Sequence, residues 1–239
     1  YCSQITRGSG QNVIALASNC NPQQIRDQDG IGSQVGLDGP LVIVQDALHP
    51  GRLLFNDEPV GKIKSLNLTT YEVRTEYAAN PNAAPSTEYS LTQERIAALA
   101  QNPYTGDVYF TRQTLDSLDV NVYLLRGGNL NTTAELLGRL KDKRVTNTHY
   151  AFTNMVSIHN ATKLVVIKPR NKFEADVRLF DVTATQTTPL RECNIGLAGL
   201  TYADGATGLL LDADDTLYFG CQAGRSEERR VGKECRSRW

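Results

Sequence analysis

Three carboxylates at short spacing, Asp212, Asp214 and Asp215, have the chemistry to bind a hard cation. Calcium prefers oxygen ligands of this kind, but the stretch lacks the central glycine and closing glutamate of an EF-hand loop. Asp residues in hairpin turns commonly hydrogen-bond their own backbone instead. We therefore predict a plain turn here rather than a calcium site.

Cysteines and sequons indicate an oxidising compartment. Of the five cysteines, four lie outside the last fifteen residues and form two pairs that are local in sequence, Cys2 with Cys20 and Cys193 with Cys221. This is compatible with two disulfides, although three connectivities are possible. No C-x-x-C or Cys/His cluster indicates structural zinc. Glycosylation sequons point the same way, so we expect an extracellular or secretory-lumen location; they begin at Asn67, Asn131 and Asn160.

Side chains suited to nucleophilic or acid–base catalysis do not form a recognisable set. His49, His149 and His159 are scattered, and His49 and His159 fall in matching turns, which favours a surface role. The sequence contains no G-x-S-x-G elbow, phosphate-binding loop or Cys/His nucleophile pair. No catalytic residue is therefore predicted from motifs.

The last fifteen residues differ from the rest of the chain. They read RSEERRVGKECRSRW, and one back-translation resembles a sequencing adapter, so we interpret residues 225–239 as a non-native tail. Without them the chain has 19 basic residues instead of 25 and 23 acidic residues instead of 26, and its net charge is -4 instead of -1. The argument for a nucleic-acid partner then disappears. Since the chain also starts at Tyr1 without a leader, we expect a fragment.

Composition fits a soluble globular protein, with 40% hydrophobic and 21% charged residues. No apolar run approaches the roughly 18 residues of a membrane span. We therefore predict no membrane segment.

A repeat of roughly 54 residues organises residues 1–224. Each unit has an apolar run, a turn rich in Asp, Asn, Gly or Pro, and a second apolar run, which is typical of a β-hairpin. The second runs lie at Leu54, Tyr109, Val165 and Leu217, spaced 55, 56 and 52 residues apart. The four hairpins are LVIVQDALHPGRLLF from Leu41, IAALAQNPYTGDVYF from Ile96, MVSIHNATKLVVI from Met155 and GLLLDADDTLYFG from Gly208.

Two further strands follow each of the first three hairpins, for example KIKSLNL from Lys62 and EVRTEY from Glu72. Four antiparallel strands per unit predict a propeller blade. The expected fold class is all-β, a β-propeller of four-stranded blades, with about four blades visible and a partial one at residues 12–17. Recurring aromatics are interpreted as core between blades, namely Tyr109, Phe110, Tyr218 and Phe219.

The first blade resembles an NHL repeat in DGIGSQVGLDGPLVIVQD from Asp29 and the following GRLLFNDEPVGKIKSLNLTTYEVRT. The matching positions are Pro40 before the innermost strand, Asp46 after it, Asp57 after the second strand and Ile63 in the third. The resemblance is concentrated in residues 29–77. It implies a ring of six blades, of which this chain holds part, and hence an unpaired blade edge.

A related propeller class, the senescence-marker/gluconolactonase group, binds a divalent cation at its axis. By blade position, this resemblance points to Glu94, Asn154 and Asp204, the last in Ala-Asp-Gly where the group has Pro-Asp-Gly. Asp204-Gly205 is also an ordinary turn dipeptide. The cofactor is thus none, or a divalent cation such as Ca²⁺.

Two functions remain open. We predict a protein- or glycan-binding scaffold with its ligand at the propeller mouth, lined by Pro40, Glu94, Asn154 and residues 203–207. The alternative is a metal-dependent hydrolase or lactonase. A purely structural segment of a larger extracellular chain is the third interpretation.

Overall fold

The computed structural model describes residues 4–9, 12–18, 27–57, 61–80, 94–114, 120–128, 130, 133–140, 154–158, 163–171, 174–181, 189–196, 206–211 and 217–221. After residue 139, the described side chains are those of Leu164, Val166 and Phe180.

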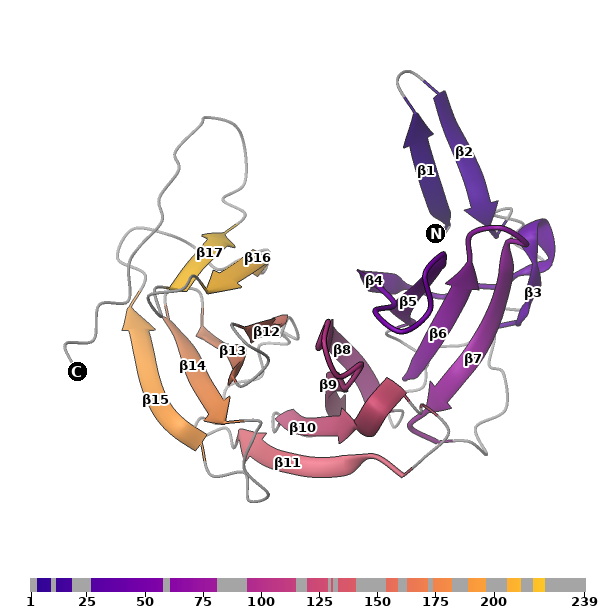
Figure 1. Ribbon diagram of the computed structural model, residues 1–239. Helices are drawn as coiled ribbons and strands as arrows, with labels where there is room; N and C mark the ends of the chain where they lie inside the picture. Colours follow the sequence, from indigo (N-terminus) through magenta and orange to yellow (C-terminus); the bar gives the residue numbers. More distant parts are fainter. Residues whose placement is uncertain are drawn as a thin grey trace.

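The described strands form successive antiparallel sheets arranged in an arc (Figure 1). Blade 1 contains β4 (Pro40–Gln45), β5 (Arg52–Asp57), β6 (Lys62–Asn67) and β7 (Glu72–Ala78). Blade 2 contains β8 (Glu94–Gln101), β9 (Val108–Thr114), β10 (Val120–Leu125) and β11 (Glu135–Leu140). Blade 3 contains β12 (Asn154–Ile158), β13 (Lys163–Asn171), β14 (Glu174–Asp181) and β15 (Pro189–Gly196). The predicted four-stranded blades of a β-propeller are confirmed.

Shorter elements complete the arc. The hairpins β1 (Ile5–Ser9) with β2 (Asn12–Ala17) and β16 (Ala206–Leu211) with β17 (Leu217–Cys221) lie at its two ends (Figure 1). The short strand β3 (Gly30–Ile31) pairs with β7 as a fifth strand of blade 1, and two 3₁₀ turns cover Gly32–Gln34 and Arg126–Gly128. The alternation of apolar residues had not predicted β1 or β3.

The inner strands of neighbouring blades lie side by side, as predicted: β4 contacts β8, β8 contacts β12, and β12 contacts β16. Asn56 connects the starts of β4 and β8, through Val42 and Ile96. Gln101, at the end of β8, contacts Asp46 directly after β4. The two inner strands β4 and β8 therefore run in the same sense.

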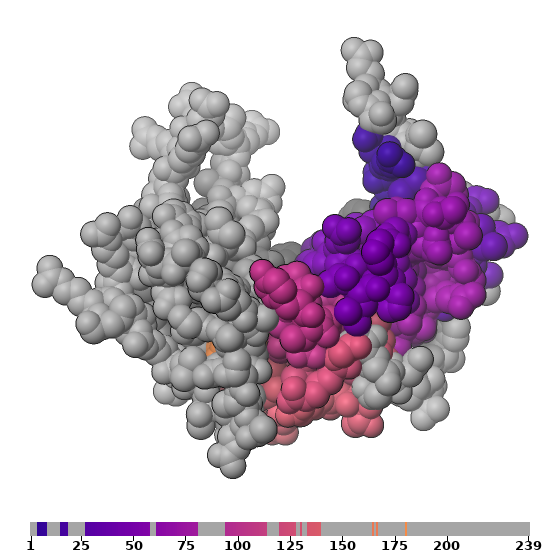
Figure 2. Space-filling model, viewed as in Figure 1, coloured from indigo at the N-terminus to yellow at the C-terminus, as the bar shows by residue number. Residues whose placement is uncertain are grey.

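Alternate faces of each sheet bury two apolar layers. One layer joins the first three blades and includes Leu54, Phe110 and Phe180. The other joins β1, β2 and the segment before β4 to the opposite face of blade 1, through Phe55 and its neighbours. Tyr109 and Phe110 are buried, as expected for core residues. Figure 2 shows the atoms of blades 1 and 2 as one continuous surface.

Exposure along the inner strands shows where a face is uncovered. In β8 all residues from Ile96 to Ala100 are buried, because blades lie against both of its faces. In β4 exposure alternates, and Leu41 and Ile43 are 44% and 47% exposed. The hairpin β1–β2 covers the part of the same face around Phe55. Leu41 and Ile43 therefore form an apolar strip on the inner strand.

Asn56 is a fully buried polar contact between two blades. Its Oδ1 accepts a hydrogen bond from Val42 N at 2.7 Å, and its Nδ2 donates to Ile96 O at 2.5 Å. The pairing of β4 with β5 and of β8 with β9 shifts register beside these two residues. The side chain therefore satisfies backbone groups that the irregular ladders leave free.

We expect Asn56→Ala to lower the free energy of unfolding by roughly 2–4 kcal/mol, because two buried backbone groups lose their partner. Gln45→Ala, on the exposed face of β4, is the control and should have little effect. Urea unfolding followed by circular dichroism measures both. Equal losses in the two variants would contradict the role assigned to Asn56.

We expect Leu41→Thr combined with Ile43→Thr to reduce self-association, because exposed apolar strips promote it. Light scattering over a concentration series measures the effect. Val42→Thr is the matched control on the same strand. Val42 packs into the core, so its substitution should lower the melting temperature and should not reduce self-association. Unchanged association in the double variant would count against this interpretation of the strip.

Candidate functional site

The predicted mouth lies where the inner strands begin. Pro40, Glu94 and Asn154 are the first residues of β4, β8 and β12, so the neighbouring strands bring their backbones to adjacent positions. The Asn154 side chain and all of Asp204 lie outside the described residues. The proposed metal set of Glu94, Asn154 and Asp204 therefore stays a prediction.

Glu94 is ion-paired with Arg112 of β9. Arg112 also donates to the Tyr77 hydroxyl at 3.2 Å and to Ala79 O at 3.4 Å, and its guanidinium lies 4.8 Å from the centre of the Tyr123 ring. These contacts connect the outer strand of blade 1 to blade 2. They also hold a cation beside the carboxylate predicted to bind metal.

A buried ionic cluster fixes the segment that enters blade 1. Lys64 is fully buried, and its Nζ lies 2.8 Å from Asp27 Oδ1 and 3.7 Å from Asp57 Oδ2. Lys62 Nζ contacts the other Asp27 oxygen at 2.6 Å. Two lysines thus neutralise two buried aspartates, as burial of charge requires.

The Asp57 carboxylate binds the backbone directly before β4. Its Oδ1 accepts hydrogen bonds from Asp38 N at 3.1 Å and Gly39 N at 2.6 Å. Burial raises the pKa of Asp57, against the opposing effects of Lys64 and these two backbone groups. The cluster therefore positions the start of β4 at the mouth.

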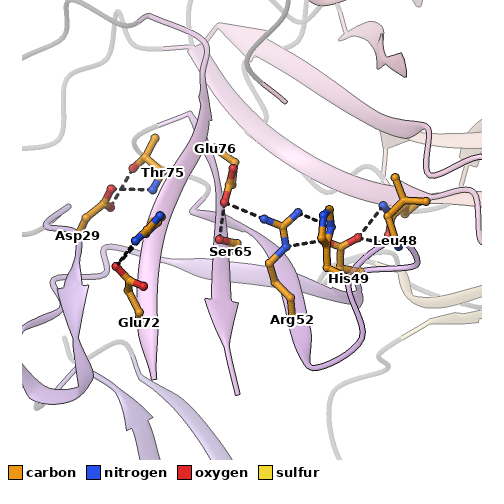
Figure 3. A network of polar contacts seen from close by, with 11 residues as sticks. Asp29, Leu48, His49, Arg52, Ser65, Glu72, Thr75 and Glu76 are labelled. Carbon is orange, nitrogen blue, oxygen red and sulfur yellow. Dashed lines mark hydrogen bonds and ion pairs between the residues drawn. The ribbon is translucent and has the colours of Figure 1, made fainter. Parts of the chain in front are cut away.

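The opposite end of blades 1 and 2 carries the turns that join β4 to β5, β6 to β7, β8 to β9 and β10 to β11, and we call it the turn face. Its described residues are 46–51, 68–71, 102–107, 126–128, 130, 133 and 134. Asp46 organises it, and Figure 3 shows its partners Leu48, His49 and Arg52. Its buried carboxylate accepts from Arg52 Nε at 2.5 Å and Leu48 N at 3.0 Å. Arg52 extends the network to Glu76 at 3.2 Å, which also accepts from Ser65 Oγ at 2.6 Å.

His49 sits at the exposed edge of this network, as the sequence predicted. Its Nδ1 lies 3.0 Å from Asp46 Oδ2 and 2.9 Å from Arg52 Nη2. One ring nitrogen cannot donate to the carboxylate while accepting from the guanidinium. These two contacts therefore compete.

Exposed large apolar side chains are concentrated on the turn face. Among the described residues there are eight such side chains, and Leu41 and Ile43 lie on β4. The other six lie in or beside the turns; they are Ile31, Leu48, Leu68, Tyr71, Tyr104 and Leu136. Tyr104 is 76% exposed. Clustering of this kind marks interaction surfaces more than single exposed residues do.

The turns that carry these side chains are held rigidly. Gln101 accepts from Ala47 N at 2.8 Å and donates to Gly106 O at 3.2 Å, so the turns of two blades are tied together. Leu48 packs directly over Gly106, where a Cβ would lie 2.4 Å from the leucine. Asn102 Oδ1 accepts from Tyr104 N at 2.9 Å and fixes the base of that exposed ring.

The remaining predicted sites are tested little by this structure. Cys193 lies in β15 and Cys221 ends β17, but their side chains, like Cys2 and Cys20, are outside the described part. The disulfides therefore stay a prediction. The same holds for the carboxylates from Asp212, the sequons at Asn131 and Asn160, and the tail at 225–239. Asn67 is described and exposed.

Two searches of the described part gave no site. No three His, Cys, Asp or Glu side chains in it are grouped so that they could hold a metal ion. No helix there is long and apolar enough to cross a membrane.

No family model and no curated protein matches this chain. Solved structures are similar in fold. A chain of the nidogen/laminin complex is 12% identical with a TM-score of 0.54, over 90% of this chain and 63% of that one. A structural genomics protein of unknown function from Bacteroides thetaiotaomicron is 12% identical with a TM-score of 0.52, over 84% and 43%. TolB from Acinetobacter baumannii is 11% identical with a TM-score of 0.51, over 97% and 47%.

These similarities support the β-propeller fold, and not the NHL family in particular. At such identities they show the fold alone. The chain spans less than two thirds of the length of each of these three structures.

Sequence reasoning placed the candidate surface at the mouth and missed the turn face. Of the positions that the resemblance implied, Asp46 directly follows β4 and Ile63 lies in β6, whereas Pro40 begins β4 and Asp57 ends β5, one residue inside the strands. The available signal for the turn face was the apolar residue in each turn, namely Leu48, Leu68, Tyr71 and Tyr104.

Asp46 should make stability depend on pH. Burial alone would raise its pKa, but hydrogen bonds from Arg52 and the Leu48 backbone, with the Arg52 charge, hold the pKa below the ordinary 3.8. A lowered folded-state pKa contributes stability above 3.8 that is lost as pH falls through the folded-state value.

We therefore expect Asp46→Asn to be less stable than the wild type at neutral pH, with the difference narrowing in acid. Urea unfolding at a series of pH values measures the difference. Glu135→Gln, in an exposed pair with Arg126, is the control and should change stability little. A difference for Asp46→Asn that stays constant with pH would contradict this assignment.

Proposed function

We propose that this chain is part of an extracellular protein-binding β-propeller whose contact surface is the turn face of blades 1 and 2. The observation that carries the proposal is that, of the eight exposed large apolar side chains among the described residues, six lie on that face. A few side chains, often tyrosine, tryptophan or arginine, supply most of the free energy of protein recognition when neighbouring contacts exclude water.

The charges of the turn face favour an uncharged partner surface. Three ion pairs lie in or beside its turns, Arg52 with Asp46, Arg74 with Glu72, and Arg126 with Glu135, and Asp107 accepts a hydrogen bond from Gly127 N at 2.7 Å. A partner need not neutralise the paired groups. Apolar burial around Leu48 and Tyr104 would then supply the affinity.

The fixed arrangement of the turns also supports a protein-binding role for the turn face. Gln101 and the Leu48–Gly106 contact hold the two turns in one arrangement, so little conformational entropy is lost on binding. A propeller chain from the nidogen/laminin complex has a similar fold. That similarity is compatible with a protein-binding role, and the extracellular location rests on the cysteine and sequon pattern.

We expect Tyr104→Ser to weaken partner binding by about tenfold or more, as loss of an interface anchor does. Glu94→Gln, at the opposite mouth, should leave binding unchanged. Proteins of the extracellular fraction are captured on each immobilised variant, and affinities for the purified partner are then measured by calorimetry. If only Glu94→Gln weakened partner binding, the ligand would lie at the mouth and the proposal would be wrong. A glycan retained equally by both variants would also contradict the proposal.

A further inference from the structure

We propose that Asn67 carries an N-linked glycan that lies over the apolar side chains Ile31, Leu68 and Tyr71 of the turn face. This inference rests on the extracellular location in the proposed function. It divides the turn face into a carbohydrate-covered part and an open part around Leu48 and Tyr104.

The Asn67 side chain has the geometry of an accessible acceptor. It ends β6, is exposed, and begins the Asn67-Leu68-Thr69 sequon. Its Oδ1 accepts hydrogen bonds from Thr69 N at 2.8 Å and Thr70 N at 3.1 Å. The amide Nδ2 makes no hydrogen bond within the described part of the chain. The carbonyl oxygen is thus held toward the turn, and the reactive nitrogen stays available to solvent.

The modification requires a lipid-linked oligosaccharide diphosphate as donor and the transferase of the secretory pathway. Asn67 Nδ2 forms a bond to C1 of the first N-acetylglucosamine. The bond from C1 to the diphosphate oxygen breaks, and the lipid diphosphate leaves with the electron pair. The proton displaced from Nδ2 passes to a base of the transferase. No oxidation or reduction takes place.

Three exposed apolar side chains surround this position. Ile31, Leu68 and Tyr71 are 54%, 36% and 41% exposed. Tyr71 N donates to Asn67 O at 2.9 Å, which closes the turn, and Tyr71 O accepts from Gly32 N at 3.0 Å, next to Ile31. These hydrogen bonds bring the backbones of Ile31 and Tyr71 close to that of Asn67, and Leu68 follows Asn67 directly.

A sugar ring packed on this surface would remove apolar area from water. One face of N-acetylglucosamine is made of C–H groups, which pack on aromatic and aliphatic side chains, while its hydroxyls remain hydrated. The Tyr71 backbone has φ of 56°, an uncommon value for a bulky residue. The chain holds a tyrosine at this strained position, and stacking against the glycan is the role that we propose for its ring.

The experiment uses the 239-residue chain with an added signal peptide, secreted from animal cells. Asn131→Gln and Asn160→Gln remove the other two sequons from every variant. Glycopeptide mass spectrometry and a gel shift after glycosidase treatment report occupancy at Asn67. Retention on a hydrophobic-interaction column, before and after glycosidase treatment of folded protein, reports how much apolar surface the glycan covers.

We expect occupancy at Asn67, loss of occupancy in both Asn67→Gln and Thr69→Ala, and retained occupancy in Thr69→Ser. Removing the glycan should lengthen column retention. This difference should shrink when Leu68→Ser and Tyr71→Asn are combined, since asparagine accepts the positive φ at this position. Circular dichroism checks that each variant is folded.

An unmodified Asn67 in secreted, folded chain would overturn the inference. So would an occupied Asn67 whose glycan does not alter retention. Partner binding is tested separately by Tyr104→Ser, which leaves the sequon intact. If the glycan is present and shortens retention but Tyr104→Ser does not change partner binding, this inference stands and the proposed function is wrong. If Tyr104→Ser weakens binding but Asn67 is unmodified, the proposed function stands and this inference is wrong.

Discussion

Polar side chains that cross from one sheet to the next fix the register of the blades, and Asn56 is central among them. Apolar contacts between stacked sheets are not directional and tolerate sliding. Asn56 ties Val42 to Ile96 near the start of the inner strands, and Gln101 ties Asp46 to the end of β8. These two contacts, one near each end of the strands, fix the position of β4 relative to β8. Both the mouth and the turn face depend on that position.

The two ends of the blades use charge differently. At the mouth end, Lys64, Asp27 and Asp57 are buried, and Lys64 together with Lys62 offsets the charge of the two aspartates inside the protein. At the turn end, Asp46 and Arg52 form a network that reaches solvent at His49. The first arrangement anchors the chain entering blade 1. The second supports turns whose apolar side chains remain exposed.

Neighbouring blades decide how much of each inner strand is covered. β8 is buried on both faces, whereas β4 exposes Leu41 and Ile43 on one. Both strands have apolar residues on both faces, so composition does not account for the difference. It arises because β1 and β2 pack around Phe55, the cross-strand partner of Ile43, and leave Leu41 and Ile43 themselves exposed.

The sequence by itself determined the blade pattern, because apolar alternation and turn residues are local properties of the chain. It predicted the four-stranded units and the core roles of Tyr109 and Phe110. It did not reveal β3, which exists only through pairing with β7. Lys64 alternates with Ile63 as a solvent-facing residue would, yet Asp27 and Asp57 make its burial possible. The turn face was decided by the tertiary structure alone, because its side chains come from separate turns that only blade stacking brings to one surface.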